Sequence, residues 1–301
     1  MAKTTVHTLD LNFLGRKSAI GAYLIQHSSG AALVESGPGS TIPGLVRGLA
    51  AYGLTPTDIT HVFITHIHLD HAGASGWLAS KGARIHVHPV GAPHMRNPEK
   101  LLSSAKRLYG DKMDALWGEF LPVPDAHLVE VQDGDEFDLG SMRITGIHTP
   151  GHAEHHVVYL VDGVAFTGDV GGVRLAGPRY LRLPLVPPEL HLGKWRESIR
   201  KLLSLDIERV VPTHFGIYPD GREHLNLALH MLDATELWLE AIMADDPPIE
   251  DLRRMFVSWQ QAQGMELGIS EDVLSVYEIA NPTWISADGL QRYWRKIRLA
   301  G

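Results

Sequence analysis

The 301-residue chain contains no cysteine, which excludes both disulfide bonds and thiolate metal ligands. It also lacks any apolar run near the roughly 20 residues that a membrane helix needs. The N-terminus has no continuous apolar stretch behind a basic start, so we expect no signal peptide. A cysteine-free chain folds in either redox setting, so the absence of cysteine leaves the compartment open. Without an export signal, the cytoplasm is the default expectation.

Basic residues are also scarce, since 27 Lys and Arg face 35 Asp and Glu and the net charge is −8. Binding to nucleic acid depends on neutralising phosphates with Lys and Arg, so this balance makes a nucleic-acid partner unexpected. A small-molecule substrate is the expected partner, and the oligomeric state stays open. Histidine is abundant instead, with 18 residues, which calls for a search for metal-ligand spacing because imidazole is the commonest protein metal ligand.

Up to about residue 215, short apolar runs that end at Gly, Pro or Asp alternate with helical stretches. The predicted strands are 22–27, 31–35, 61–65, 84–88, 127–131, 142–147, 157–161, 164–167 and 209–211. The predicted helices of this part lie near 42–52, 72–81, 99–120 and 194–205. This mixture predicts an α/β sandwich rather than a purely parallel sheet.

After Pro219 the pattern becomes helical throughout. Helices are predicted at 223–244, 249–263, 272–279 and 286–299, with turns at Asp246-Pro247-Pro248, Gly264 and Asn281-Pro282. We therefore expect one domain over residues 1–218 and a C-terminal helical region over 219–301.

The central motif is Thr65-His66-Ile67-His68-Leu69-Asp70-His71, directly after the apolar run at 62–64. His66 and His68 are two residues apart in extended chain, so their side chains point to the same side. Asp70 and His71 follow where the next helix begins and can face a second point nearby. One short loop can thus supply ligands to two ions.

Three further polar residues come at the ends of later predicted strands, each beside Gly or Pro. They are His152 in Pro150-Gly151-His152, Asp169 in Gly168-Asp169, and His214 in Pro212-Thr213-His214. Together with the central motif, this order resembles the metallo-β-lactamase superfamily over roughly residues 5–216. The resemblance implies an αββα sandwich carrying a C-terminal helical appendage.

By the same resemblance, His66, His68 and His152 would hold one ion, Asp70, His71 and His214 the other, and Asp169 would bridge them. Two such metal ions lower the pKa of a water that they share. The metal-bridging hydroxide that results attacks a carbonyl or a phosphorus. Asp70 would be the catalytic residue that passes a proton to the leaving group. The ligand set predicts two divalent ions, with zinc favoured and Mn or Fe credible.

Two departures from the family pattern stand out. The early acidic position of the family's D-T-G motif holds Glu35, which we expect to support a ligand rather than bind an ion. His155 and His156 follow His152, and we interpret them, like His148, as hydrogen-bonded neighbours of the site rather than ligands.

The motif also narrows the class of hydrolase. His68 stands where the flavodiiron branch typically has an acidic residue, and the separation of 62 positions from His152 to His214 (214 − 152) leaves no room for a β-CASP insert. The remaining group resembles glyoxalase II and includes thioesterases, lactonases and phosphodiesterases. We expect hydrolysis of an ester, thioester or lactone. Alternatives are a phosphodiesterase or nuclease, a metal protein without turnover, and an iron redox protein.

Two regions are candidates for substrate contact. The long segment from Pro89 to Pro124 has a helical centre and could be a lid or pocket wall, or else a solvated surface helix. Downstream of Asp169, several side chains could bind an anionic substrate or polarise its oxygen, or could face water. These side chains are Arg174, Arg179, Tyr180, Arg182, His191 and Tyr218.

Overall fold

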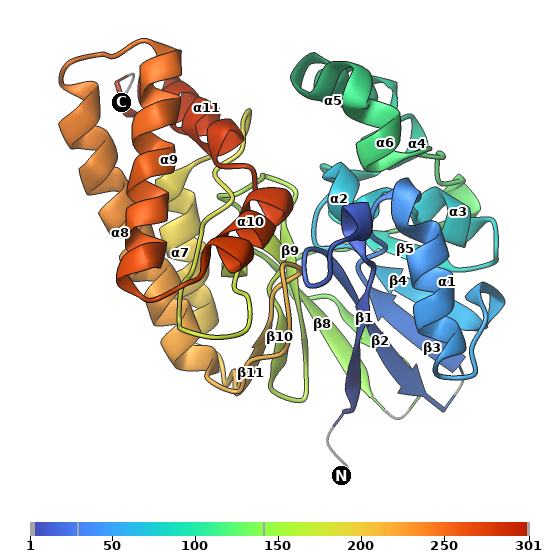
Figure 1. Ribbon diagram of the computed structural model, residues 1–301. Coiled ribbons are helices and arrows are strands. Elements are labelled where there is room, and N and C mark those ends of the chain that lie inside the picture. The colour runs from blue at the N-terminus through green and yellow to red at the C-terminus, as the bar shows by residue number, and fades with distance from the viewer. Residues whose placement is uncertain (1–3, 29, 141, 300–301) are drawn as a thin grey trace.

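The computed structural model describes residues 4–28, 30–140 and 142–299; the outer ends of the two predicted regions, residues 1–3 and 300–301, lie outside it. Two β-sheets face each other at the centre of the molecule, with helices on their outer faces (Figure 1). The six-stranded sheet runs in chain order through β1 (Val6–Asp10), β2 (Gly21–His27), β3 (Gly30–Val34), β4 (Ile59–Phe63), β5 (Arg84–Val87) and β6 (Leu128–Glu130). The five-stranded sheet has the order β11 (Arg209–Val211), β10 (Val164–Phe166), β9 (Val157–Val161), β8 (Arg143–His148), β7 (Glu136–Asp138).

Alternating apolar side chains explain why each sheet is covered on both faces. Tyr23 and Ile25 of β2 point into the core between the sheets, whereas Ala22 and Leu24 point outward. In β9, Val157 and Tyr159 likewise face the other sheet. Because successive strand residues point to opposite faces, a strand that is apolar throughout needs a packed layer on either side.

The outer layers are helical, and the helices lie on both sides of the paired sheets (Figure 1). Outside the six-stranded sheet are α1 (Ile42–Ala50), α2 (Leu69–Ala72), α3 (Ser75–Ala79), α4 (Ala92–Arg96), α5 (Glu99–Tyr109) and α6 (Met113–Trp117). On the other side are α7 (Leu192–Leu203), α8 (Gly221–Met243), α9 (Ile249–Glu266) and α11 (Thr283–Tyr293). Between the two sides lies α10 (Glu271–Ala280).

The C-terminal helices contribute to both outer cores. Leu239 of α8, Phe256 of α9 and Leu290 of α11 pack with the core over the five-stranded sheet. Tyr277 of α10 instead packs with the core of the six-stranded sheet. The helical region after residue 219 therefore reaches across the edge where the two sheets meet.

Several elements differ from the sequence prediction. Strands β1 and β7 were not predicted, since both are short and carry partly exposed side chains. The predicted helix over 72–81 is divided between α2 and α3. The one predicted over 99–120 breaks at Gly110, whose φ of +54° ends α5 before a 3₁₀ turn and α6 begin.

Strand direction gathers several chain segments at one edge of the sandwich. In the six-stranded sheet, β3 to β6 are parallel. In the other sheet, β8 and β10 are both antiparallel to β9, and β11 is parallel to β10. The carboxyl ends of β8, β10 and β11 therefore lie at one edge, where the loops after β4, β8, β10 and β11 can meet.

Candidate metal centre

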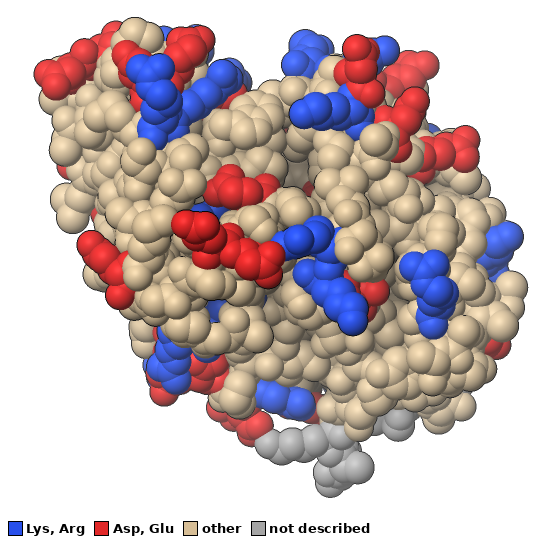
Figure 2. Space-filling view, in the orientation of Figure 1, with Lys and Arg blue, Asp and Glu red and all other residues tan. Residues whose placement is uncertain are grey.

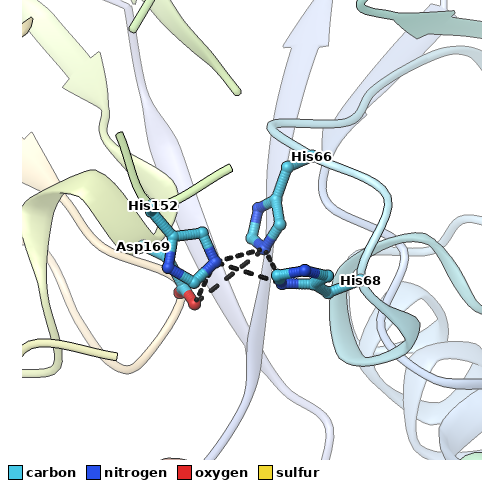
Figure 3. A group of neighbouring side chains, drawn as sticks. All are labelled: His66, His68, His152 and Asp169. Carbon is cyan, nitrogen blue, oxygen red and sulfur yellow. Dashed lines mark hydrogen bonds and ion pairs between the residues drawn. The ribbon is translucent and has the colours of Figure 1, made fainter. Parts of the chain in front are cut away.

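One group of possible metal ligands combines residues from both sheets. His66 and His68 follow β4, His152 follows β8 and Asp169 follows β10 (Figure 3). His66 Nε2 lies 2.9 Å from His68 Nδ1, and His152 Nε2 lies 3.2 Å and 3.1 Å from those two atoms. A tetrahedral ion with metal–nitrogen bonds of about 2.0–2.1 Å keeps its ligand nitrogens about 3.3 Å apart. The three imidazoles therefore fit around one ion.

A second group lies beside the first and consists of Asp70, His71 and His214. Asp70 Oδ2 is 3.6 Å from His71 Nε2 and 3.4 Å from His214 Nε2. Asp70 and His71 belong to α2, at the end of the central motif, whereas His214 follows β11. This group also joins the two sheets.

Asp169 faces both groups with different oxygen atoms. Its Oδ2 lies 3.3 Å from His152 Nε2 and 3.9 Å from His66 Nε2. Its Oδ1 lies 3.3 Å from His71 Nε2 and 3.6 Å from His214 Nε2. One carboxylate can therefore serve an ion in each group.

Three of these ligand atoms are buried polar atoms without a hydrogen-bond partner, namely His71 Nε2, His214 Nε2 and Asp169 Oδ1. Unpaired buried polar atoms are rare because each costs about 1–3 kcal/mol. A cation between these three atoms would satisfy all of them. The residues present thus fit a metal pair.

The other ring nitrogen of most ligand histidines is already hydrogen-bonded. His152 Nδ1 donates to the Pro184 carbonyl and His214 Nδ1 to the Ala19 carbonyl, both at 2.7 Å. Such bonds fix the ring and leave Nε2 as the atom with a free lone pair. Gly151 allows the His152 loop to pack here, since a Cβ at this residue would lie 2.4 Å from the backbone nitrogen of Trp195.

Glu35 supports the second group in the way the sequence suggested. Its fully buried carboxylate Oε1 accepts from His71 Nδ1 at 3.0 Å, from Thr65 Oγ1 at 2.5 Å and from Thr213 Oγ1 at 2.9 Å. Glu35 therefore ties the loops after β4 and β11 together behind His71 and does not belong to either ligand group.

The electrostatics of the two groups differ. Burial lowers the pKa of His66 well below its usual range and that of His152 to about 4, so both rings are neutral. Burial also opposes charge on His71, but the carboxylates of Asp70 and Asp169 outweigh it and raise the pKa of His71 well above the usual range. The centre as a whole therefore attracts positive charge.

The centre forms part of the floor of a cavity of about 520 Å³. His68, Asp70 and Asp169 line its floor, and its walls come from the region of α4 to α6 on one side and from 184–189 and 278–285 on the other. Figure 2 shows this hollow between two lobes of the molecule. The segment from Pro89 to Pro124 is thus a wall of the cavity.

The extra histidines lie close to the centre but outside the two ligand groups. His156 Nδ1 is 2.8 Å from Thr149 Oγ1 and its Nε2 accepts from the Val170 amide. His155 lines the cavity, and its Nε2 is 3.6 Å from a carboxylate oxygen of Glu189. His148 instead pairs with His88, at 3.1 Å between ring nitrogens.

The arginines expected to contact substrate point elsewhere, and that expectation is corrected here. Arg174 is buried and makes a two-pronged ion pair with Asp220, at 2.9 Å and 3.0 Å. Arg179 shares the same partner, at 3.0 Å. Arg182 is buried and pairs with Glu278. These side chains satisfy charges within the fold, and none of them lines the cavity.

The other three candidates also have internal partners. Tyr180 donates to the Gln260 carbonyl at 2.6 Å, and Tyr218 donates to the Arg174 and Phe215 carbonyls at 2.5 Å and 2.7 Å. His191 begins α7, where its Nδ1 accepts from the Lys194 amide at 3.2 Å. None of the three lines the cavity.

Sequence reasoning missed the opposite wall of the cavity. Pro184 and Glu189 lie on one loop, and Ile279, Trp284 and Ile285 come from α10 and α11. No short motif marks these residues, because they reach the centre only through the packing of the C-terminal helices.

Comparison with known proteins agrees with this geometry. The family model of the metallo-β-lactamase superfamily matches residues 18–214, more than half of the chain. The metallo-β-lactamase fold-containing protein ST1585 of Sulfurisphaera tokodaii is 31% identical over 57% of this chain and 67% of its own length. A hydroxyacylglutathione hydrolase of Aeromonas hydrophila is 31% identical over 49% of this chain, and the match spans only 44% of that protein.

Solved structures show the same fold. The metallo-β-lactamase family protein TTHA1429 of Thermus thermophilus superimposes with a TM-score of 0.69 at 21% identity, covering 97% of this chain and 93% of the other. The crystal structure of ST1585 gives a TM-score of 0.61 at 22% identity, over 77% and 86% of the two chains. The predicted αββα sandwich with a C-terminal helical region is confirmed, and the chain belongs to the metallo-β-lactamase superfamily.

Proposed function

We propose that the protein is a hydrolase that uses two divalent metal ions to cleave an ester, thioester or lactone. The observation that carries this proposal is the position of Asp169, whose two oxygens face two separate groups of ligand atoms at the floor of the cavity. The relative named hydroxyacylglutathione hydrolase supports the choice of reaction class.

His66, His68 and His152 would hold one ion, and Asp70, His71 and His214 the other, with Asp169 shared. Bound ions would lower the pKa of a water and polarise the carbonyl that it attacks. Nitrogen and carboxylate ligands without sulfur suit zinc, and they also accommodate Mn or Fe.

Asp70 is the ligand carboxylate best placed to handle a proton. It lines the cavity, and its side chain is 19% exposed against 6% for Asp169. Nearby histidines overcome the effect of burial and lower the pKa of Asp70 to about 2, so the carboxylate is ionised, as a metal ligand must be.

Two features of the cavity bear on the substrate. The candidate metal centre lies between the two walls of this cavity, which favours a small molecule over a folded partner. Lys100 and Lys112 line one wall and form no ion pair with the described residues, so an anionic substrate is compatible with the site. A phosphodiester is the alternative substrate class.

A substrate panel tests this proposal. Protein reconstituted separately with Zn, Mn and Fe is assayed against p-nitrophenyl esters, acyl thioesters, lactones and bis-p-nitrophenyl phosphate. We expect metal-dependent turnover of carbonyl substrates that is lost in His152→Ala. Faster turnover of the phosphodiester would select the alternative, and absence of turnover with two bound ions would refute hydrolysis.

A further inference from the structure

We propose that the substrate carries an apolar acyl chain, which lies between α5–α6 and the α10–α11 turn. This inference rests on the proposed function, because the chain must belong to the molecule whose carbonyl reaches the centre. It adds a class of substrate that the ligand set does not specify.

The walls of the cavity are largely apolar. Leu101, Ala105 and Trp117 line one side, and Ile279, Trp284 and Ile285 line the other. The volume of about 520 Å³ lies within the roughly 300–1,000 Å³ typical of small-molecule sites. The space is therefore suited to a flexible chain or ring that extends from the centre.

Exposed apolar side chains gather at the same cavity. The described residues include nine large apolar side chains that are exposed, and three of them, Leu14, Val90 and Leu108, line this cavity. The three come from separate segments, before β2, before α4 and in α5. Three exposed apolar side chains that come together from separate segments indicate a binding surface better than a single exposed side chain would.

Leu14 has a second unusual property. Its φ is +51°, in the left-handed region that a leucine adopts only at a cost, and its side chain is 53% exposed. Packing in the core does not account for this geometry, because the side chain lies largely outside the core. Strained backbone that presents an apolar side chain to a cavity points to a role in ligand contact.

The charged groups indicate how the chain is oriented. Lys100 and Lys112 are exposed, whereas Glu278 is paired with Arg182 and Thr283. A leaving group must return to water, and the exposed lysines suit one that departs as an anion. The apolar walls are then left for the acyl chain.

Binding of carboxylate products tests the inference without requiring turnover. Metal-loaded protein is titrated calorimetrically with acetate, butyrate, hexanoate, octanoate and decanoate. We expect affinity to rise up to about fourfold for each methylene that becomes buried. Hydrolysis of the matching p-nitrophenyl esters should rise in kcat/KM with chain length in parallel.

Two variants each remove one of the exposed apolar side chains that line the cavity, which we call the rim residues, and each variant has a control. Leu14→Gly suits the left-handed backbone and Leu108→Ser alters an exposed side chain, so both should fold. Each should reduce the gain from acetate to decanoate by about fivefold to tenfold. The controls are Asn12→Gly, also at positive φ (+53°), and Leu237→Ser, a 67% exposed leucine on α8; neither should change the gain.

The outcomes separate the two proposals. Length-dependent binding of carboxylates without hydrolysis of any ester, thioester or lactone would uphold the acyl pocket and refute the proposed function. Hydrolysis with equal affinity for acetate and decanoate would do the reverse. Equal effects of the rim variants and their controls would also overturn the acyl pocket.

Discussion

Two clusters of largely buried charged side chains each include a residue from the segment that follows β10, Asp169 in one and Arg174 in the other. In the candidate metal centre, side-chain atoms of Asp70, His71, Asp169 and His214 face one another at 3.3–3.6 Å. In the other cluster, Arg174 is clamped by Asp220 and lies 4.0 Å above the ring of Tyr218.

The two clusters differ in whether the charged and polar groups of each are balanced within the protein. The arginine cluster contains both signs of charge, so its main charges cancel within the protein. The centre combines carboxylates with imidazoles whose buried atoms lack partners, and only an added cation can satisfy them. Burial of charge by itself therefore does not mark a functional site, whereas convergence of unpaired acceptors does.

The largest contrast should come from Asp169→Asn. The amide keeps the volume but loses the negative charge shared by both ligand groups. We expect kcat to fall about a thousandfold, which is about 4 kcal/mol, with a native circular dichroism spectrum. Elemental analysis should show fewer than two ions per chain. Near-normal turnover at full metal content would remove Asp169 from the centre.

Arg174→Ala should have the opposite signature. Loss of this buried cation leaves Asp220 unpaired, and we expect the free energy of unfolding in urea to fall by about 3–5 kcal/mol with metal content unchanged. Arg179→Ala is the matched control, because Arg179 contacts the same carboxylate from an exposed position and should cost less than about 1 kcal/mol. A selective rise in KM for anionic substrates in Arg174→Ala would instead return this arginine to the substrate site.

His224 gives the arginine cluster a dependence on pH. Its Nε2 donates to the Gly171 carbonyl at 2.7 Å, and burial lowers its pKa to about 4. The unfolded chain binds a proton near pH 6.5, so stability is full above that pH and is lost as pH falls toward 4. We expect about 2–3 kcal/mol of that loss by pH 4.5.

Urea unfolding of wild-type protein and His224→Gln at pH 7 and pH 4.5 measures this loss. Both proteins are kept in chelator, so that release of ions does not contribute. The variant should lose less stability than the wild type between the two pH values. An identical pH dependence in both proteins would show that His224 is not responsible.

Glu35→Gln should have the smallest of the four effects. It should act on the second ligand group, which contains His71. The amide can still contact His71 and Thr213 but no longer stabilises the ring as a carboxylate does. We expect affinity for the more weakly held ion to fall about 10–100-fold. Chelator competition measures it, with Glu189→Gln as a cavity carboxylate that should leave affinity unchanged. Equal losses in both variants would contradict the role assigned to Glu35.

The residues of the candidate metal centre were predictable from the sequence because each one follows an apolar strand within a few residues. His66 to His71 and Asp169 inherit their location from β4 and β10, and strand direction brings them to one edge. The positions of the arginine side chains after Asp169 were not predictable from the sequence, because the direction of a loop depends on distant partners such as Asp220 and Glu278. The cavity was hidden for the same reason, since Leu101 and Ile285 meet only in three dimensions.

Each ligand group draws on both sheets, and this has a mechanical consequence. Neither the loop after β4 nor the loops after β8, β10 and β11 hold a complete set of ligands. An ion would bind to the packed sandwich, where the ligand set is complete, and not to the separated sheets. By mass action it would therefore stabilise the packed form. In a chain without cysteine, and therefore without disulfide bonds, the two metal ions would act as a reversible cross-link between the sheets. The free energy of unfolding would rise with metal concentration and fall when a chelator removes the ions.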